Sequence, residues 1–267
     1  MTLTKIVRKA YIRFIRPRFK EELSWQRMKL PWFVWQYAQL FGVRGITLGQ
    51  KLFLLRKFLR IDWFVTLAHQ PGEIVAVLRH ISQRAALPGE VIVEAGCWQG
   101  GSSAKFSWMA RLLGYRLIIY DSFQGVESVQ ETQDGRGTDF SGTFASPQSV
   151  LIHNLQRYGA VDACEIVPGW FADTLARTPV HAPVRAAFID CDIAKGTYEV
   201  LQGVLPSLAA DGVIFSQDFH IPPVVDLLKN PQTWQKLNAD FPRMHYEGGT
   251  LVSMRFDSGA MVKSPGQ

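Results

Sequence analysis

Cysteine is scarce in this sequence, and the spacing that would give it a structural role is missing. The three cysteines, Cys97, Cys164 and Cys191, lie far apart, and none belongs to a C-x-x-C pair. Disulfide frameworks use even sets of cysteines, and zinc sites use closely spaced ligand pairs, so the pattern indicates neither. We therefore expect a reducing, cytoplasmic environment.

Long apolar runs are also missing. The most apolar early stretch, residues 31–43, is too short to cross a bilayer. Basic residues interrupt the first 18 positions and no small-residue cleavage site follows, so we expect no secretory signal. With 47% hydrophobic and 19% charged residues over 267 positions, the composition favours a globular chain with a sizeable core.

Acidic residues are rare near the N-terminus. Residues 1–70 hold 14 lysines and arginines against 3 acidic residues, a net charge of +11. Aromatic residues crowd positions 30–41, and residues 5–19 and 48–64 have apolar residues near helical spacing. We define residues 1–69 as a basic, aromatic-rich helical arm. It fits an anionic partner, such as a lipid surface, an acidic carrier or nucleic acid, and equally a solvated face on packing helices or a homodimer contact.

From Gln70 onward, short apolar runs alternate with amphipathic stretches. Such alternation predicts an α/β fold with a mostly parallel, Rossmann-like sheet and helices on both faces. We expect this domain to span residues 70–257, with a tail at 258–267. The predicted strands are 91–93, 117–120, 164–167, 185–189 and 213–215. The predicted helices are 73–86, 147–158, 197–208 and 224–240. A predicted antiparallel hairpin pairs 244–246 with 251–256.

A glycine-rich loop connects the first strand to a helix. In the stretch 94–103, Gly96, Gly100 and Gly101 allow a sharp turn and close approach of a ligand to the backbone. Ligands of nucleotide-binding α/β folds lie at this carboxyl edge of the sheet. Glu94 adds an acid that can hold the ammonium of a bound amino acid, which a dinucleotide lacks. The loop therefore favours a nucleoside ligand that carries an amino acid.

Asp121 ends the second predicted strand, 27 residues after Glu94. A carboxylate at this position can accept hydrogen bonds from ribose hydroxyls. Together with the glycine loop, it predicts a nucleoside site.

A distinctive string follows the third predicted strand, namely Gly169-Trp170-Phe171-Ala172-Asp173-Thr174-Leu175. Together with the segments 94–103, 121–125, 142–144 and 189–192 with Thr197, this string resembles the macrocin O-methyltransferase (TylF) family across residues 70–256. The string is the most specific part of the resemblance. The resemblance implies a class I S-adenosylmethionine fold and transfer of a methyl group to a hydroxyl of a natural-product sugar or related scaffold.

The resemblance also implies where S-adenosylmethionine would bind. The methionine and ribose would lie against Glu94 and the glycine loop, the ribose diol on Asp121, and the adenine beyond the third strand. Trp170 and Phe171 also fit plain core packing. The implied cofactor-binding residues are Glu94, Gly96, Gly100, Gly101, Ser102, Asp121, Ser122, Phe123, Gly169, Trp170, Phe171 and Asp190.

A metal site is implied at the ends of the fourth and fifth strands. Asp190, Asp192, Gln217 and Asp218 would hold magnesium, which would position and acidify the acceptor hydroxyl. The family has an acid where this sequence has Gln217, and a neutral amide weakens a site that depends on negative charge. Lys195 stands in another altered segment, either neutralising these acids or solvated at a helix start.

Two catalytic schemes and one non-catalytic alternative remain open. Asp190 would act at the reacting centre with the metal, or His220 would act as general base without one. Residues 126–146 are polar and glycine-rich and predict a lid that excludes water. The non-catalytic alternative keeps the cofactor fold as a partner-binding module. Neither the acceptor nor the oligomeric state follows from the sequence.

Overall fold

The structure is a computed structural model that describes residues 22–128 and 140–257. The predicted helical pattern at 5–19, the tail 258–267 and the middle of the predicted lid lie outside these residues.

A seven-stranded sheet forms the centre of the molecule, with strand order β3-β2-β1-β4-β5-β7-β6. The first five strands are parallel, and β7 pairs antiparallel with both β5 and β6. This confirms the predicted α/β fold with an antiparallel C-terminal hairpin. The strands are β1 (Val91–Ala95), β2 (Arg116–Asp121), β3 (Cys164–Pro168), β4 (Val184–Ile189), β5 (Leu208–Ser216), β6 (Arg243–Gly248) and β7 (Leu251–Arg255).

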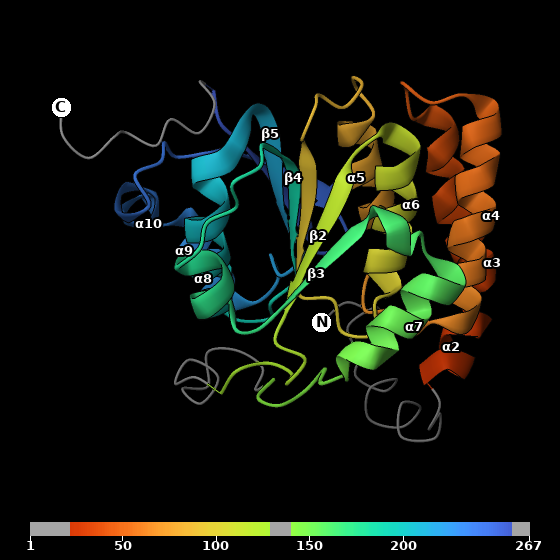
Figure 1. The fold of residues 1–267 in the computed structure, drawn as a ribbon, viewed down its shortest axis with the longest axis horizontal. Helices are drawn as coiled ribbons and strands as arrows, with labels where there is room; N and C mark the ends of the chain where they lie inside the picture. Colours follow the sequence, from red (N-terminus) through yellow and green to blue (C-terminus); the bar gives the residue numbers. More distant parts are fainter. Residues whose placement is uncertain (1–21, 129–139, 258–267) are drawn as a thin grey trace, which may run out of the picture.

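Helices cover both faces of the sheet (Figure 1). Strands β1 and β4 are buried at every position, as expected for parallel strands covered on both sides. One side carries α2 (Glu22–Met28), α3 (Leu30–Tyr37), α4 (Leu48–Phe64), α5 (Pro71–Ile81), α6 (Gly101–Leu113) and α7 (Gln148–Tyr158). The other carries α8 (Ala194–Val204), α9 (Pro222–Lys229) and α10 (Pro231–Lys236).

The described helices of the arm pack on the domain. Thr47 caps the N-terminus of helix α4, and its hydroxyl accepts a hydrogen bond from the Gln50 amide in a capping box. It buries Leu54, Phe58 and Ile61 at helical spacing, in the same hydrophobic core as the sheet side chains beneath α6. The domain boundary at residue 70 stays a prediction, but α3 and α4 complete a helical layer over the sheet.

One predicted helix is wrong in a way that proline explains. The stretch 224–240 forms two helices, because Pro231 has no amide hydrogen to continue α9. The Asn230 side chain instead accepts a hydrogen bond from the Gln232 amide and starts α10.

Two further helix boundaries differ from the prediction. Helix α5 ends at Ile81 rather than at residue 86. The next residue, Ser82, donates a side-chain hydrogen bond to the Arg44 carbonyl. Helix α8 covers 194–204 rather than 197–208, and β5 already begins at Leu208. Gly212 therefore lies within β5, where an added Cβ would stand 2.7 Å from the Val184 carbonyl oxygen. No helix among the described residues is long and apolar enough to cross a membrane.

Candidate active site

A cavity opens at the carboxyl edge of the parallel strands, where the predicted site residues converge. It encloses about 1200 Å³ of space including its open mouth. The same space extends from the glycine loop to the acids that follow β4. The predicted residues that line it are Gly96, Gly101, Ser102, Asp121, Ser122, Gly169, Trp170, Phe171, Asp190, Asp192, Gln217 and His220.

Four predicted residues do not line the cavity. Gly100 has φ +83° and caps α6, and an added Cβ would stand 2.4 Å from a Leu151 methyl. Phe123, Glu94 and Asp218 are not among the lining residues. Their proposed contacts with a ligand stay predictions.

The glycine loop is held tightly between two strands. Gly96 has φ +86°, and an added Cβ would lie 1.8 Å from the Asp190 carbonyl oxygen. Its amide donates to the Tyr120 carbonyl on β2 at 2.9 Å, and the Asp190 amide donates to Ala95 on β1 at 2.9 Å. Only glycine fits this crossing, so the loop and the acid at the end of β4 are fixed relative to each other.

Asp121 organises the loop through its side chain. One carboxylate oxygen accepts hydrogen bonds from the Cys97 amide at 2.7 Å and the Trp98 amide at 3.2 Å. The other accepts one from the Phe123 amide at 2.7 Å and keeps a lone pair for a ligand hydroxyl. The carboxylate therefore fixes the loop and also faces the cavity.

Glu94 is fully buried below the loop. No hydrogen bond to either carboxylate oxygen is found among the described residues. Burial raises the pKa of Glu94 to about 7, and the nearby Ser102 and Ser103 hydroxyls act in the opposite direction. A buried acid without a cation to pair with is costly, so a ligand ammonium near it would be stabilised.

Aromatic side chains form another part of the cavity. Trp170 and Phe171 line it after β3, and Phe171 also packs against the core on the α8 side. Trp98 and Phe144 meet edge to face with ring centroids 5.4 Å apart. No sequence signal selects Trp98, because a single aromatic residue in a glycine loop carries no motif.

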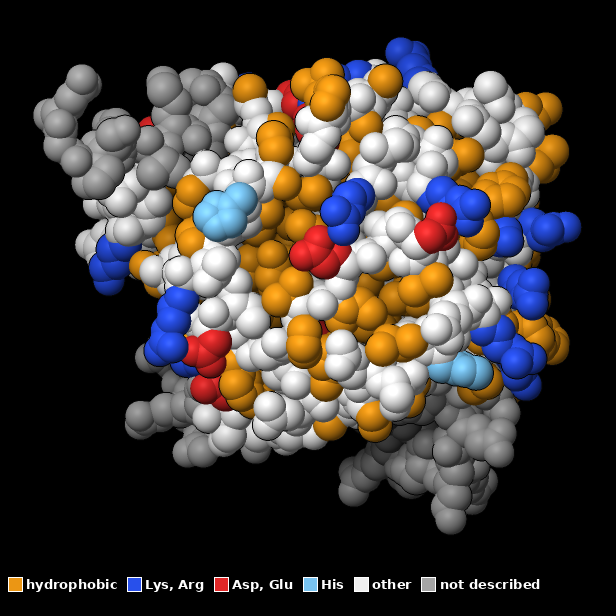
Figure 2. All heavy atoms as spheres, in the orientation of Figure 1, with side chains coloured by type: hydrophobic (Ala, Val, Ile, Leu, Met, Phe, Trp, Pro, Cys, Tyr) orange, Lys and Arg blue, Asp and Glu red, His pale blue; other side chains and the backbone are white. Residues whose placement is uncertain are grey.

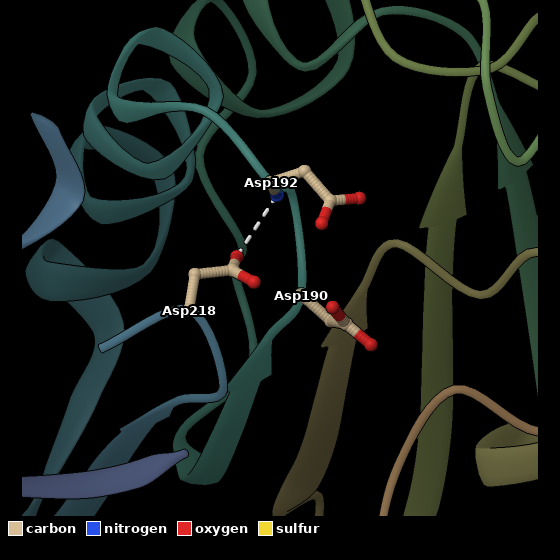
Figure 3. A group of neighbouring side chains, drawn as sticks. All are labelled: Asp190, Asp192 and Asp218. Atoms are coloured by element: carbon tan, nitrogen blue, oxygen red, sulfur yellow. Dashed lines mark hydrogen bonds between the residues drawn. The ribbon is translucent and has the colours of Figure 1, made fainter. Parts of the chain in front are cut away.

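Three carboxylates meet where β4 and β5 end (Figure 3). Asp190 and Asp192 follow β4 and Asp218 follows β5, and one oxygen from each lies within 4.8 Å of the others. Asp218 is fully buried, and one of its oxygens accepts hydrogen bonds from the Cys191 amide at 2.8 Å and the Asp192 amide at 2.9 Å.

Burial and mutual repulsion disfavour the ionised forms of these acids. Burial raises the pKa of Asp192 to about 6 and, with the charge of Asp192, that of Asp218 to about 8. Burial and then the charges of Asp218 and Asp192 hold the pKa of Asp190 well above its usual value. The cluster lacks a compensating positive charge among its described hydrogen-bond partners, so a proton or a cation would stabilise it.

Gln217 lies between two of these acids. With its amide oriented to satisfy its neighbours, the nitrogen donates to Asp218 Oδ1 at 3.2 Å and Asp190 Oδ1 at 3.1 Å. In this orientation Gln217 is a donor to the acids, and its predicted role as a metal ligand would require the amide to turn. Lys195 forms ion pairs with Glu127 at 2.6 Å and Glu199 at 2.8 Å.

Comparison with known proteins identifies the family. The model of the macrocin-O-methyltransferase (TylF) family matches residues 70–250. The chain belongs to this family. The predicted resemblance is thereby confirmed over most of the predicted domain.

Two curated relatives are natural-product methyltransferases. The chain is 32% identical over 146 residues to 8-demethyl-8-(2,3-dimethoxy-alpha-L-rhamnosyl)-tetracenomycin-C 4'-O-methyltransferase of Streptomyces olivaceus, covering 51% of this chain and 54% of that protein. It is 29% identical over 152 residues to demethyldecarbamoylnovobiocin O-methyltransferase of Streptomyces niveus, covering 52% and 56%. The chain thus aligns with about half the length of these relatives.

Solved structures share the fold. The O-methyltransferase NovP has a TM-score of 0.60 at 18% identity, covering 86% of this chain and 99% of that one. The calicheamicin methyltransferase CalS11 has a TM-score of 0.55 at 18% identity, covering 85% and 92%. The fold is therefore that of the class I methyltransferases.

Proposed function

We propose that this protein is an S-adenosylmethionine-dependent O-methyltransferase that acts on a sugar hydroxyl of a natural product or a related scaffold. The observation that carries the proposal is one cavity that joins the glycine loop and Asp121 to Asp190 and Asp192 after β4, with Asp218 close to both acids. The curated relatives, two O-methyltransferases of natural products, support the class of acceptor.

The cofactor would lie along the carboxyl edge of the sheet. Its ribose would bind the remaining lone pair of Asp121, its methionine would lie over Gly96 and Gly101, and its adenine would contact Trp170. When bound, S-adenosylmethionine supplies a methyl group made electrophilic by the adjacent sulfonium. The protein then has to align the acceptor oxygen in line with that methyl and remove its proton.

Asp190 is our candidate for handling that proton. It lines the cavity and is fixed against the glycine loop by the close crossing at Gly96. Its raised pKa makes it a stronger base than an exposed aspartate when it is ionised. An acceptor hydroxyl beside Asp190 would donate its hydrogen bond to this carboxylate.

A divalent cation fits the same acids. Asp190, Asp192 and Asp218 offer hard oxygen ligands close enough to share one ion, and their strained charges favour a cation. Magnesium bound there would acidify and orient the acceptor hydroxyl. His220 also lines the cavity and is the candidate base for turnover without metal.

We expect Gln217→Asp to tighten magnesium binding by roughly 10-fold or more, because it adds a carboxylate and removes the amide donor between two acids. Magnesium titration followed by thermal unfolding would measure this, with Gln232→Asp at an exposed position of α10 as the matched control. Unchanged magnesium affinity would remove position 217 from the site. Full turnover of the wild type in chelator would transfer the proton role to His220.

Methyl transfer itself is tested with S-adenosylmethionine carrying a labelled methyl group and a panel of glycosylated polyketides, aminocoumarins and nucleotide-linked deoxysugars. We expect label in an ether on a sugar of at least one acceptor. The non-catalytic binding module would be favoured if the protein binds the cofactor but transfers no methyl group to any acceptor of the panel, and if cofactor binding does not need Asp190, Asp192 and Asp218.

The outer face of α4 supports a role for the arm. Leu52, Arg56, Arg60 and Trp63 are exposed at helical spacing, and basic side chains gather on this side of the molecule (Figure 2). The pKa of the neighbouring Lys57 is lowered by burial and by surrounding arginines, so an anion here would be stabilised. We propose that this face binds the anionic lipid surface on the cytoplasmic side of a membrane.

We expect Arg56→Glu combined with Arg60→Glu to lower partitioning onto phosphatidylglycerol vesicles by at least about 10-fold, since each basic residue near such a surface contributes about 1 kcal/mol. Vesicle sedimentation measures this, with exposed Arg177→Glu as control. If the double variant and the Arg177→Glu control partition equally, the outer face of α4 is ordinary solvated surface. If light scattering shows that the double variant changes the oligomeric state, this face is a homodimer contact instead.

A further inference from the structure

A buried polar cluster outside the predicted site connects the arm to the cavity. Lys105 on α6 and Asp62 on α4 are both fully buried and form an ion pair at 2.5 Å. Tyr37 on α3 donates a hydrogen bond to the other Asp62 oxygen at 2.8 Å. The Lys105 ammonium also lies 2.9 Å from Nε2 of His69. The proposed methyl transfer uses none of these residues.

His69 is the member of this cluster that reaches the cavity. It is only 5% exposed, yet it lines the cavity together with the preceding residues 66–68. These residues lie against the glycine loop, because an added Cβ on Gly101 would stand 3.0 Å from the Thr66 carbonyl oxygen. His69 therefore faces the cavity beside the start of α6.

The cluster determines which nitrogen of His69 carries the proton. An ammonium has only donors, so Nε2 must accept from Lys105. Burial and then the Lys105 charge hold the pKa of His69 well below its usual value, so the ring is neutral. A neutral ring with an accepting Nε2 carries its hydrogen on Nδ1. Among the described residues, Nδ1 has no hydrogen-bond partner.

This arrangement makes His69 a donor and excludes it as a base. Both of its nitrogens are committed, one as acceptor to Lys105 and one as an N–H. The first-turn amides of α6, which have no acceptor within the helix, lie at the same side of the cavity. Donors from a side chain and from a helix N-terminus together suit an anion.

We propose that His69 Nδ1–H and the first turn of α6 bind the carboxylate of the methionine part of the cofactor, with Lys105, Asp62 and Tyr37 as positioning residues that fix the ring. This inference rests on the proposed function, since it assigns a role within the same cofactor site. It gives the arm a second role, because two of its helices supply Asp62 and Tyr37 to that site.

The test compares S-adenosylhomocysteine with its decarboxylated analogue, which lacks only the carboxylate. By calorimetry, we expect His69→Leu to weaken S-adenosylhomocysteine by about 10- to 100-fold, the value of a hydrogen bond to a charged group, and the analogue by less than about 3-fold. His69→Gln, which keeps an N–H donor, should recover most of the loss. Equal losses for both ligands, or no loss for either, would overturn the proposal.

A second measurement needs no variant. In wild-type protein with ¹⁵N-labelled histidine, the His69 signals should show the Nδ1–H tautomer and shift with S-adenosylhomocysteine but far less with the analogue. An Nε2–H tautomer, or equal shifts, would overturn the proposal. If wild-type protein binds S-adenosylhomocysteine and the His69 signals do not shift, this inference alone is wrong. If wild-type protein binds neither ligand, the proposed function is wrong as well.

Discussion

Replacing Asp190 by asparagine is expected to reduce methyl transfer by at least about 10³-fold, because the variant keeps the shape of the side chain but loses the charge that handles the proton or holds a cation. Cofactor binding should change much less. The measurement is initial rate with labelled cofactor at saturating acceptor, with exposed Asp173→Asn as the matched control. Turnover within about 10-fold of the wild type would remove Asp190 from the chemistry.

The same substitution should not destabilise the protein at pH 8. The folded protein holds protons on this cluster that the unfolded chain has released, since the pKa values of Asp190, Asp192 and Asp218 are all raised. The free energy of unfolding therefore falls as pH rises from about 4 towards 8, and Asp190→Asn should flatten this decline. Urea unfolding at pH 5 and pH 8 measures it. An equally steep decline in the variant would contradict the mutual repulsion of these acids.

Gly96→Ala is expected to cost far more stability than its backbone angle alone explains. Gly89 has φ +81° with open space around it, whereas Gly96 has φ +86° and the Asp190 carbonyl oxygen only 1.8 Å from an added Cβ. Gly89→Ala should cost about 1–2 kcal/mol, the penalty of a left-handed conformation. Gly96→Ala must also push β4 away from the loop.

We therefore expect Gly96→Ala to lose more than about 3 kcal/mol of unfolding free energy, or to give no folded protein, and to lose cofactor binding. Urea unfolding of both variants gives the difference. Equal losses for the two alanine variants would mean that the loop is free to move away from β4, contrary to the fixed geometry that aligns Asp190.

The sequence predicted the parts of this molecule that depend on local pattern. Apolar runs located the strands because parallel strands are buried on both faces, and glycine spacing located the loop because its backbone angles require glycine. The acids after β4 and β5 were found for the same reason, since adjacent parallel strands end at one edge.

Features that depend on contacts between distant segments could not be predicted from the sequence. The role of His69 comes from Lys105 on α6 and Asp62 on α4, and no local spacing connects these positions. Likewise, Gln217 suggested only a weakened metal ligand, whereas the fold places its amide between Asp190 and Asp218. Pro231 was the exception, because its effect on the helix is local and could have been anticipated.

Binding of S-adenosylhomocysteine to wild type and to Asp121→Ala, followed by calorimetry, tests the central claim that the cavity is a cofactor site. We predict a single site in the wild type and a loss of roughly 1–3 kcal/mol in the variant, because the ribose loses its acceptor and the loop amides of Cys97 and Trp98 lose theirs. Exposed Asp162→Ala should bind as the wild type does. Absence of binding to the wild type, or undiminished affinity in a folded Asp121→Ala protein, would contradict the account.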